Sequence, residues 1–194
     1  MLDTYGRKYV NPLINFTANI FINMNFTANF ITVTAFLVGI SSVAFIYFDL
    51  PYIAVGVLWF SGFLDAVDGA MARKMQKPTA LGTLMDITFD RLVEMSIVLS
   101  LAIKLPKSIL HLLILTICIL LSMTIFLTVG ALTEKKGMKS FYYQAGLAER
   151  TEGFIMFSLM IIFQSHLNII TDIFSILVFI TALQRLNEAR KIFV

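Results

Sequence analysis

Four aspartates, Asp65, Asp68, Asp86 and Asp90, stand in two otherwise apolar stretches of this chain. Residues three or four apart share one face of a helix, so Asp65 is expected near Asp68 and Asp86 near Asp90. Clustered carboxylates repel one another unless a cation neutralises them. The types and spacing of these residues therefore predict a cation site made by two neighbouring helices.

The chemistry of the ligands narrows the choice of cation. Oxygen ligands without a nearby histidine or cysteine select Mg²⁺, Mn²⁺ or Ca²⁺ over zinc or copper. Four carboxylates can hold two such divalent ions about 3.5–4 Å apart, the arrangement that clamps phosphoryl oxygens during a displacement. Gly69 and Gly82 leave room for a ligand, and the donor fork of Arg73 suits a phosphate.

In an alternative interpretation, the aspartates only pair with Arg73, Arg91 and neighbouring lysines.

The composition indicates the solvent in which these helices lie. Of 194 residues, 58% are hydrophobic and 14% are charged, and the mean hydropathy is +0.85, whereas a soluble domain averages about 45–50% apolar and about 25% charged residues. Ten glycines and the single Cys118 exclude collagen and a disulfide scaffold. A net charge of +3 without one basic face does not indicate a nucleic-acid partner. We therefore predict an integral membrane protein.

The apolar stretches are long enough for spanning helices, which need about 20 residues each. They predict an all-α integral membrane protein with a single membrane domain over residues 1–194 and no cleavable signal peptide. The six expected transmembrane helices lie near residues 30–48, 52–72, 80–103, 108–132, 147–165 and 168–186.

The basic residues predict the orientation of these spans. With both termini cytoplasmic, twelve of the 15 lysines and arginines lie on the inner side. Lys104 and Lys107 lie outside and Arg91 lies within a span, which is the bias of the positive-inside rule. We expect a bacterial-type cytoplasmic membrane, with both termini and the active site on the cytoplasmic side.

The depths of the four aspartates agree with one shared pocket. The link between the second and third spans is short, so these two helices should be antiparallel neighbours. Counted from Thr79 at the membrane boundary, Asp86 and Asp90 lie about 10 and 16 Å deep, at about 1.5 Å per residue. On the other helix, Asp68 and Asp65 reach about 8 and 12 Å. All four carboxylates are therefore expected in a pocket open to the cytoplasm.

A short N-terminal helix is expected before the first span, over about residues 12–24. Asn11 followed by Pro12 is typical of an N-cap and a first helical position. Apolar residues recur three or four apart with asparagines between them, which predicts an amphipathic interfacial helix in the headgroup plane. The apolar positions are Leu13, Phe16, Ile20 and Met24. A helix packed on other helices is an equally good interpretation.

Eight positions between residues 65 and 90 form a pattern with fixed gaps: Asp65, Asp68, Gly69, Ala72, Arg73, Gly82, Asp86 and Asp90. This pattern resembles the signature of the CDP-alcohol phosphotransferase (CDP-alcohol phosphatidyltransferase) family. The resemblance implies a membrane enzyme that transfers the phosphatidyl group of CDP-diacylglycerol, or a similar CDP-linked lipid, to a polar alcohol acceptor and releases CMP. It also implies two divalent metal ions, Mg²⁺ or Mn²⁺, a lipid-bilayer environment and a homodimer.

The resemblance further implies roles for individual residues. Asp65, Asp68 and Asp86 would ligate metal, and Asp90, beside the metal, would be the general base that deprotonates the acceptor hydroxyl. The nucleotide and diphosphate would contact Asp65, Asp68, Gly69, Ala72, Arg73 and Gly82.

One departure from the family pattern lies before the first span. Many members carry Thr-Pro-Asn where this chain has Thr27-Ala28-Asn29, followed by Thr32. Asn29 and Thr32 are therefore expected either at the nucleotide or as caps of the first spanning helix.

The motif leaves the acceptor alcohol open. Phosphatidylinositol-phosphate synthases of the family carry an Arg-containing element at the end of the fourth span, where this chain has Val129-Gly130-Ala131-Leu132. Inositol phosphate therefore loses support, and glycerol 3-phosphate or another polyol or polyol phosphate is favoured. The segment that follows is similar to an uncharacterised bacterial branch with a Lys-Ser-Phe-Tyr-Tyr element. Its candidate acceptor-binding residues are Lys135, Lys136, Lys139, Tyr142, Tyr143 and Arg150.

Other readings of these residues compete. Lysines in a cytoplasmic loop also serve orientation, and tyrosines also form the interfacial belt. Intramembrane acids mark ion pathways, so a divalent-cation channel or transporter is a rival function, although no comparable series of acids continues through the later spans. A catalytically inactive scaffold of the same fold is the second rival, although all eight motif positions are intact.

Overall fold

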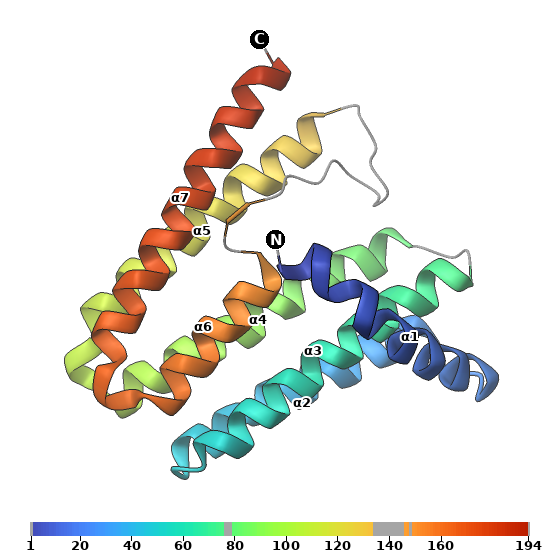
Figure 1. Cartoon of the computed structure of the whole chain (residues 1–194), viewed down its shortest axis with the longest axis horizontal. Coiled ribbons are helices and arrows are strands. Elements are labelled where there is room, and N and C mark those ends of the chain that lie inside the picture. Colours follow the sequence, from blue (N-terminus) through green and yellow to red (C-terminus); the bar gives the residue numbers. More distant parts are fainter. Residues whose placement is uncertain (1, 76–78, 134–145, 148, 194) are drawn as a thin grey trace. The chain divides into compact units, whose positions relative to one another are not determined.

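This computed structural model describes residues 2–75, 79–133, 146–147 and 149–193, with side chains from Val10 onward. Over these ranges all regular secondary structure is helical, as predicted. Residues Thr4–Lys104 form one compact unit, the N-terminal unit, and the chain from Leu105 onward belongs to a second, the C-terminal unit. The helices (Figure 1) are α1 (Leu2–Asn23), α2 (Ala28–Tyr47), α3 (Pro51–Lys74), α4 (Ala80–Lys104), η1 (Pro106–Ser108), α5 (Ile109–Leu132), α6 (Arg150–Ile162), η2 (Gln164–His166) and α7 (Leu167–Phe193).

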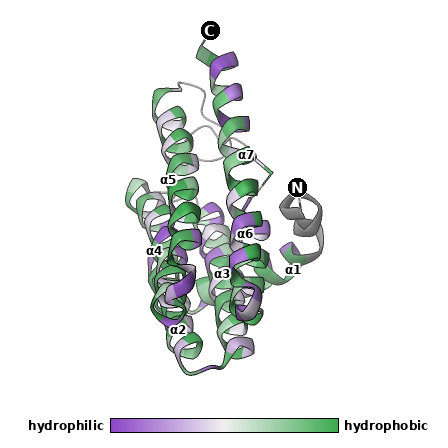
Figure 2. Cartoon of the chain, turned by 90° about the vertical axis from the view of Figure 1, so that its left-hand side faces the viewer, coloured by the Kyte–Doolittle hydropathy of each residue, from purple (hydrophilic) through white to green (hydrophobic). Residues whose placement is uncertain are grey.

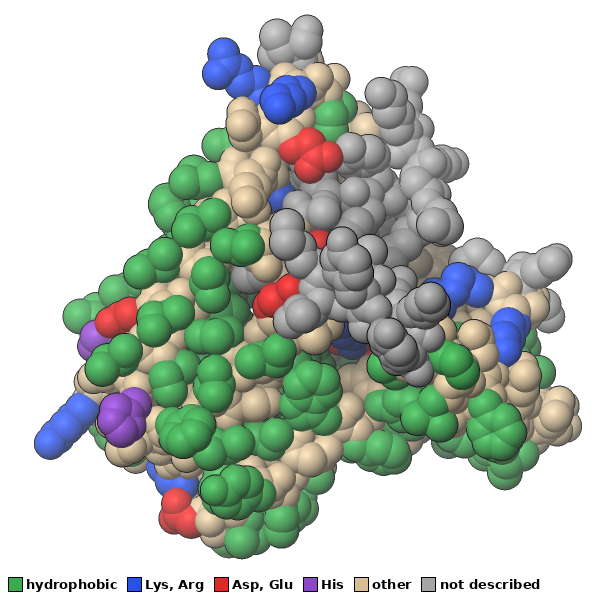
Figure 3. All heavy atoms as spheres, viewed as in Figure 1, with side chains coloured by type: hydrophobic (Ala, Val, Ile, Leu, Met, Phe, Trp, Pro, Cys, Tyr) green, Lys and Arg blue, Asp and Glu red, His purple; other side chains and the backbone are tan. Residues whose placement is uncertain are grey.

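Within the described ranges, four helical segments are long and apolar enough to cross a membrane: α2, α3, α5 with η1, and α7 with η2. Figure 2 shows the long apolar runs of α5 and α7 in green. Leu110, Leu120 and Leu132 of α5 are 65–66% exposed, and hydrophobic side chains cover much of the surface visible in Figure 3. Such faces require an apolar solvent, because exposed leucine is stabilised by transfer out of water. The chain is an integral membrane protein.

The helices agree with the predicted spans at most ends, but only four of the six meet the length and composition of a span. α4 has 25 residues, which is about 37 Å, but it contains several charged side chains. α6 has 13 residues and is about 20 Å long, shorter than a hydrocarbon core of about 30 Å. α7 continues to Phe193, beyond the predicted end at residue 186.

α1 begins ten residues before the predicted start. Pro12 lies inside this helix, so the prediction of an N-cap at Asn11 is wrong. Proline fixes φ near the helical value and removes only one backbone hydrogen bond, so the helix continues across it. One face of α1 packs in the core of the N-terminal unit. Ala18 on this face is fully buried, and Ile14 and Phe21 are partly buried.

The predicted apolar stripe of α1 faces outward. Its exposed fractions lie between 41% and 64%, for Leu13, Phe16, Ile20 and Met24. α1 therefore has one apolar face packed on other helices and a second one exposed. The interpretation as a packed helix describes the first face, and the position of α1 in the headgroup plane stays a prediction.

Local sequence sets the starts of α2 and α3. The Thr27 hydroxyl accepts a hydrogen bond from the backbone N–H of Phe30 at 3.2 Å and forms the N-cap of α2. Pro51 occupies the first turn of α3, where its missing N–H costs little. The preceding turns place Asn25 and Asp49 at φ values of 62° and 58°, a conformation that asparagine and aspartate adopt more readily than other non-glycine residues. α2 and α3 run side by side in opposite directions (Figure 1).

Gly39 of α2 lies where α2, α3 and α4 pack together. A Cβ at this glycine would lie 2.7 Å from both Ser61 Oγ and Val93 Cγ2. Ser61 also donates a hydrogen bond to the carbonyl of Ala35 at 2.8 Å. The absence of a side chain at Gly39 therefore permits the close approach of the three helices.

Substituting Gly39 with alanine should destabilise the N-terminal unit by about 1–3 kcal/mol, because the added methyl group overpacks a filled site. Thermal unfolding in detergent measures this change. Gly56→Ala on α3 is the matched control, since no atom lies within 4 Å of the added Cβ, and it should preserve stability. Equal losses in the two variants would contradict the packing described here.

In the C-terminal unit, α5 and α7 are parallel neighbours joined by polar contacts. His111 Nδ1 lies 2.7 Å from Asp172 Oδ1 near the starts of the two helices. Further along, the buried Arg185 donates from Nη1 to the carbonyl and hydroxyl of Ser122, at 3.2 and 2.9 Å. Its guanidinium carbon lies 4.8 Å from the ring centroid of Phe126. These contacts compensate the burial of a charge inside a spanning helix.

Candidate active site

The last turns of α3 divide into a core face and an acidic face. Val67, Ala70 and Met71 are buried in the core shared with α1 and α2. Asp65 and Asp68 belong to the other face and are only 8% and 5% exposed. The two carboxylates are therefore largely withdrawn from solvent, on a face of α3 that does not belong to this core.

Asp65 and Asp68 of α3 meet Asp86 of α4. One carboxylate oxygen from each residue lies within 4.8 Å of the other two. Asp86 is half-buried. We call these three residues the carboxylate cluster. Oxygen ligands at this spacing fit a hard divalent cation, and a cation would offset the mutual repulsion of the carboxylates.

The structure does not place Asp90 in the carboxylate cluster. Asp90 is half-buried and lies one helical turn beyond Asp86 on α4. Asp90 shares a face of α4 with Asp86 but lies about 6 Å further along the helix axis. Of the four carboxylates expected together, three converge, and the role of Asp90 beside the metal stays a prediction.

Gly69 and Arg73 lie one turn apart at the end of α3. A Cβ at Gly69 would meet a single atom within 4 Å, Arg73 Nη1 at 3.4 Å, which is an ordinary contact. Packing within the described protein therefore does not require a glycine here. The open space above Gly69 and the exposed guanidinium of Arg73 together suit the approach of an anionic ligand.

Gly82, at the start of α4, lies close to polar atoms of two other residues, one before the helix and one on α2. A Cβ there would lie 3.0 Å from Thr79 Oγ1 and 3.1 Å from Asn29 Oδ1. Thr79 accepts a hydrogen bond from the Gly82 N–H at 3.0 Å and thereby caps α4. The first turns of α2 and α4 are thus neighbours, and Asn29 lies beside a residue of the eight-position motif.

The remaining two predicted nucleotide contacts are less exposed to a ligand. Ala72 is half-buried, and Thr32 is 6% exposed. The Thr32 hydroxyl donates to the carbonyl of Ala28 in its own helix at 3.0 Å. Because Thr27 is the N-cap of α2, the alternative expectation that Asn29 or Thr32 caps this helix is wrong.

Most of the predicted acceptor residues lie outside the described residues; they are Lys135, Lys136, Lys139, Tyr142 and Tyr143. Arg150 is the exposed first residue of α6. Its guanidinium carbon lies 5.9 Å from the ring centroid of Phe154, which is within the range of a cation–π interaction. The Val129–Gly130 pair, which replaces the basic element of the inositol-phosphate enzymes, is buried in the C-terminal unit.

The sequence interpretation overlooked two polar residues that position the candidate site. Lys74 Nζ donates to the carbonyl of Asn15 at 2.9 Å and to Asn19 Oδ1 at 2.7 Å, which ties α1 to the end of α3 beside Arg73. Thr79 caps α4 at Gly82. A threonine before an apolar helical run was a usable signal for Thr79, whereas Lys74 could not be told apart from a lysine that only sets orientation.

Comparison with known proteins gives a family and relatives. The CDP-alcohol phosphatidyltransferase profile matches residues 25–184. Archaetidylinositol phosphate synthase of Methanothermobacter thermautotrophicus is 34% identical over 88 residues, which are 45% of this chain and 42% of that protein. The chain thus matches less than half the length of this relative. The Escherichia coli inner membrane protein YnjF is 26% identical over 195 residues and covers 95% of this chain and 93% of YnjF.

Solved structures show the same fold. Mycobacterium tuberculosis phosphatidylinositol phosphate synthase (PgsA1) with CDP-DAG bound has a TM-score of 0.75, with 19% identity over 92% of this chain and 94% of PgsA1. PgsA1 in complex with manganese and citrate has a TM-score of 0.74 over 91% of this chain and 88% of that one. The family match runs from the start of α2 into α7 and includes all eight motif positions. This chain therefore belongs to the CDP-alcohol phosphatidyltransferase family of membrane enzymes.

Proposed function

We propose that this enzyme transfers the phosphatidyl group of CDP-diacylglycerol, or of a similar CDP-linked lipid, to the hydroxyl of a polar alcohol and releases CMP. The carboxylate cluster is the observation that carries this proposal, because three buried or half-buried acids with oxygens within 4.8 Å of one another offer the ligands that a hard divalent cation prefers. The CDP-DAG bound to PgsA1 supports a CDP-linked lipid as the donor.

Two divalent ions, Mg²⁺ or Mn²⁺, are the proposed cofactor. Asp65, Asp68 and Asp86 would hold them, since carboxylate oxygens are the ligands that both ions prefer. When bound, such ions neutralise a diphosphate and improve CMP as a leaving group. The manganese in a PgsA1 structure supports this assignment.

The side chains around the cluster have distinct proposed roles. Asp90 accepts the proton of the acceptor hydroxyl, whose oxygen then forms a bond to the phosphorus of the phosphatidyl group. The bond from that phosphorus to the bridging oxygen breaks, and CMP leaves with the electron pair. Arg73 donates hydrogen bonds to phosphate oxygens. Gly69, Ala72 and Gly82 leave room for the nucleotide.

Of the two predicted nucleotide contacts on α2, Asn29 is the better placed. Its Oδ1 lies beside Gly82, whereas the hydroxyl of Thr32 already donates to the carbonyl of Ala28. We therefore assign a nucleotide contact to Asn29 and a supporting position in the first turn of α2 to Thr32.

The acceptor is proposed to be a polyol or polyol phosphate. Relatives are named for inositol-phosphate chemistry, while this chain has Val129 and Gly130 where the family's basic element is expected. Glycerol 3-phosphate and inositol phosphate are therefore the two acceptors to be compared first. Arg150, with the lysines and tyrosines of the segment before α6, is proposed to contact the acceptor.

The proposed topology has six spans in one membrane domain. α4 and α6 are proposed to cross the bilayer with the four segments described above, because the predicted spans 80–103 and 147–165 overlap them, and the span that contains α6 is longer than the helix itself. Both termini and the carboxylate cluster face the cytoplasm, as the distribution of basic residues predicts. The exposed stripe of α1 rests on the bilayer surface, and two copies form a homodimer.

The variant Gly69→Ala is expected to lower enzymatic activity without lowering the stability of the fold. The added methyl group meets a single described atom at van der Waals distance, so the unfolding temperature should remain close to that of the wild type. CMP release should fall about tenfold or more, because displacing a bound phosphate by less than 1 Å costs at least about 1.4 kcal/mol of transition-state stabilisation. Full activity of this variant would contradict a ligand-facing role for Gly69. Gly56→Ala on the same helix is again the control.

The proposed reaction is tested by incubating the purified enzyme with CDP-diacylglycerol, Mg²⁺ or Mn²⁺, and a panel of acceptors. CMP should appear only when donor, metal and a suitable polyol or polyol phosphate are all present, and a new phospholipid should form in equal amount. Release of CMP without any acceptor, or with none of the panel, would contradict the proposed transfer.

The rival functions predict different outcomes. A channel or transporter should move Mn²⁺ across liposomes without CDP-lipid, which a fluorescent ion indicator inside the vesicles detects. An inactive scaffold should bind CDP-diacylglycerol and release no CMP with any acceptor. We expect CMP release and no ion flux.

A further inference from the structure

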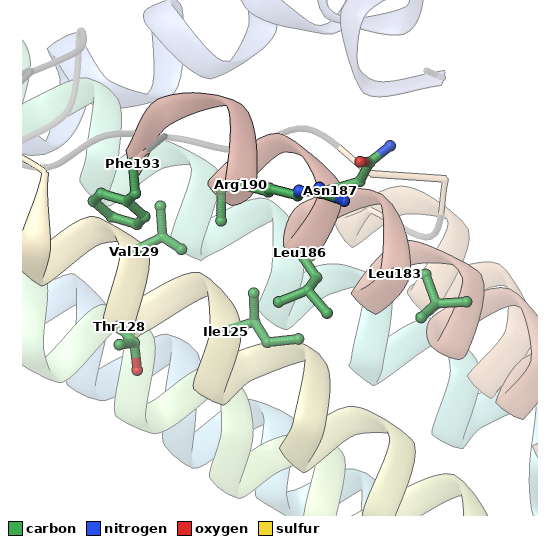
Figure 4. A pocket seen from close by; sticks show the side chains of 9 residues that line it. Ile125, Thr128, Val129, Leu183, Leu186, Asn187, Arg190 and Phe193 are labelled. Atoms are coloured by element: carbon green, nitrogen blue, oxygen red, sulfur yellow. The ribbon is translucent and has the colours of Figure 1, made fainter.

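A groove of about 620 Å³ lies between the C-terminal parts of α5 and α7, both in the C-terminal unit. Ile125 and Val129 of α5 form one wall, and Leu186 and Phe193 of α7 form the other (Figure 4). This groove belongs to neither the carboxylate cluster nor the eight-position motif.

The groove has the length and polarity of a site for a lipid chain. Leu183, Leu186 and Phe193 are 50–54% exposed, and both helices are long and apolar enough to span a membrane. From Leu183 to Phe193 the wall rises about 15 Å, and the predicted span of this helix ends at residue 186, so the groove runs from the hydrocarbon core into the headgroup region. In a bilayer, an acyl chain is the material available to fill such a groove.

On the α7 wall the polar residues of the groove lie between Leu186 and Phe193, and the one charged side chain among the lining residues is basic (Figure 4). Asn187 and Arg190 line it, one turn apart on α7, and both are exposed. All lining residues belong to the described part of the chain, and none of them is acidic. A guanidinium presents several donors in a plane, which matches the oxygens of a phosphate. Basic pockets between spanning helices are typical binding sites for anionic headgroups.

We propose that this groove binds an anionic phospholipid. One acyl chain lies along Ile125 and Leu186, and the headgroup phosphate accepts hydrogen bonds from Arg190 and from the amide of Asn187. The lipid therefore acts as a structural ligand of the α5–α7 pair, separate from the lipid that reacts.

Native mass spectrometry of the detergent-purified protein with added phosphatidylglycerol tests the proposal. Arg190→Gln should weaken the lipid adduct about fivefold, the change that about 1 kcal/mol per basic residue produces. Lys191→Gln is the matched control, because Lys191 is exposed, adjacent in sequence and outside the groove lining, and it should leave binding nearly unchanged. Unfolding temperatures should stay equal without added lipid, since both residues are exposed.

A second variant tests the groove itself. Thr128 is exposed and lines the groove, so Thr128→Trp should fill it and reduce the adducts of phosphatidylglycerol and phosphatidylcholine alike. Wild-type protein should bind phosphatidylglycerol more tightly than phosphatidylcholine.

Three outcomes would overturn the proposal. Equal losses in Arg190→Gln and Lys191→Gln would mean general surface electrostatics, and an unchanged adduct in Thr128→Trp would exclude the groove. A shift from dimer to monomer in Thr128→Trp, with lipid bound per chain unaltered, would mean that a second copy of this chain occupies the groove.

Discussion

Asp65→Asn is expected to reduce CMP release by at least about a thousandfold while the protein remains folded. A metal ion contributes several kcal/mol to the stabilisation of developing charge, and each 1.36 kcal/mol is a factor of ten in rate. Asp65 is 8% exposed and its carboxylate lies within 4.8 Å of those of Asp68 and Asp86, so loss of its negative charge weakens the whole carboxylate cluster. The rate of CMP formation, with unfolding in detergent as a check on folding, measures this effect.

A matched variant controls for the loss of one negative charge. Asp49 lies between α2 and α3 and pairs with Lys104 at 2.5 Å, in the same unit but outside the carboxylate cluster. Asp49→Asn should retain nearly all activity, because the Asp49 side chain is 80% exposed and Lys104 keeps its hydrogen bond to the carbonyl of Ile46. Activity of Asp65→Asn close to that of Asp49→Asn would refute a metal-binding role for Asp65.

Asp90→Asn is expected to lower CMP release about 10²–10⁴-fold, the usual contribution of a general base. Because Asp90 lies outside the carboxylate cluster, this variant should bind Mn²⁺ with nearly wild-type affinity. Asp65→Asn should lose both activity and Mn²⁺ affinity. Electron paramagnetic resonance of free Mn²⁺ in a titration separates the two variants.

Either of two results would contradict the role of Asp90. Wild-type turnover in Asp90→Asn would remove it from the reaction. A loss of Mn²⁺ affinity equal to that of Asp65→Asn would make Asp90 a metal ligand instead of a base.

The sequence predicts the helices well because hydrophobicity and length dominate their placement. α5 ends at the predicted residue 132, and α4 begins at the predicted residue 80. The start of α1 is missed for a local reason: Asn11-Pro12 is a good start signal, yet the same proline is tolerated inside a longer helix. The cap of α2 is ambiguous for a similar reason, because threonine and asparagine both cap helices well and the backbone geometry selects Thr27.

In the candidate site, too, some features follow from the sequence pattern, whereas others depend on how the helices pack together. Spacing and depth along the helices together predict the meeting of Asp65, Asp68 and Asp86. By spacing Asp90 shares this face of α4 as well, so its absence from the carboxylate cluster is a tertiary feature that the spacing does not specify. Arg185 illustrates the limit of charge counting: the sequence assigns it to the inner side, while in the structure it is buried against Ser122 and Phe126.

Anomalous diffraction from crystals grown with Mn²⁺ and a CDP-linked lipid tests the central claim most directly. We predict manganese peaks within coordination distance of the Asp65, Asp68 and Asp86 carboxylates, with the diphosphate of the nucleotide on the opposite side of the metal. Manganese bound elsewhere, or a bound nucleotide with no metal at these three residues, would contradict the account.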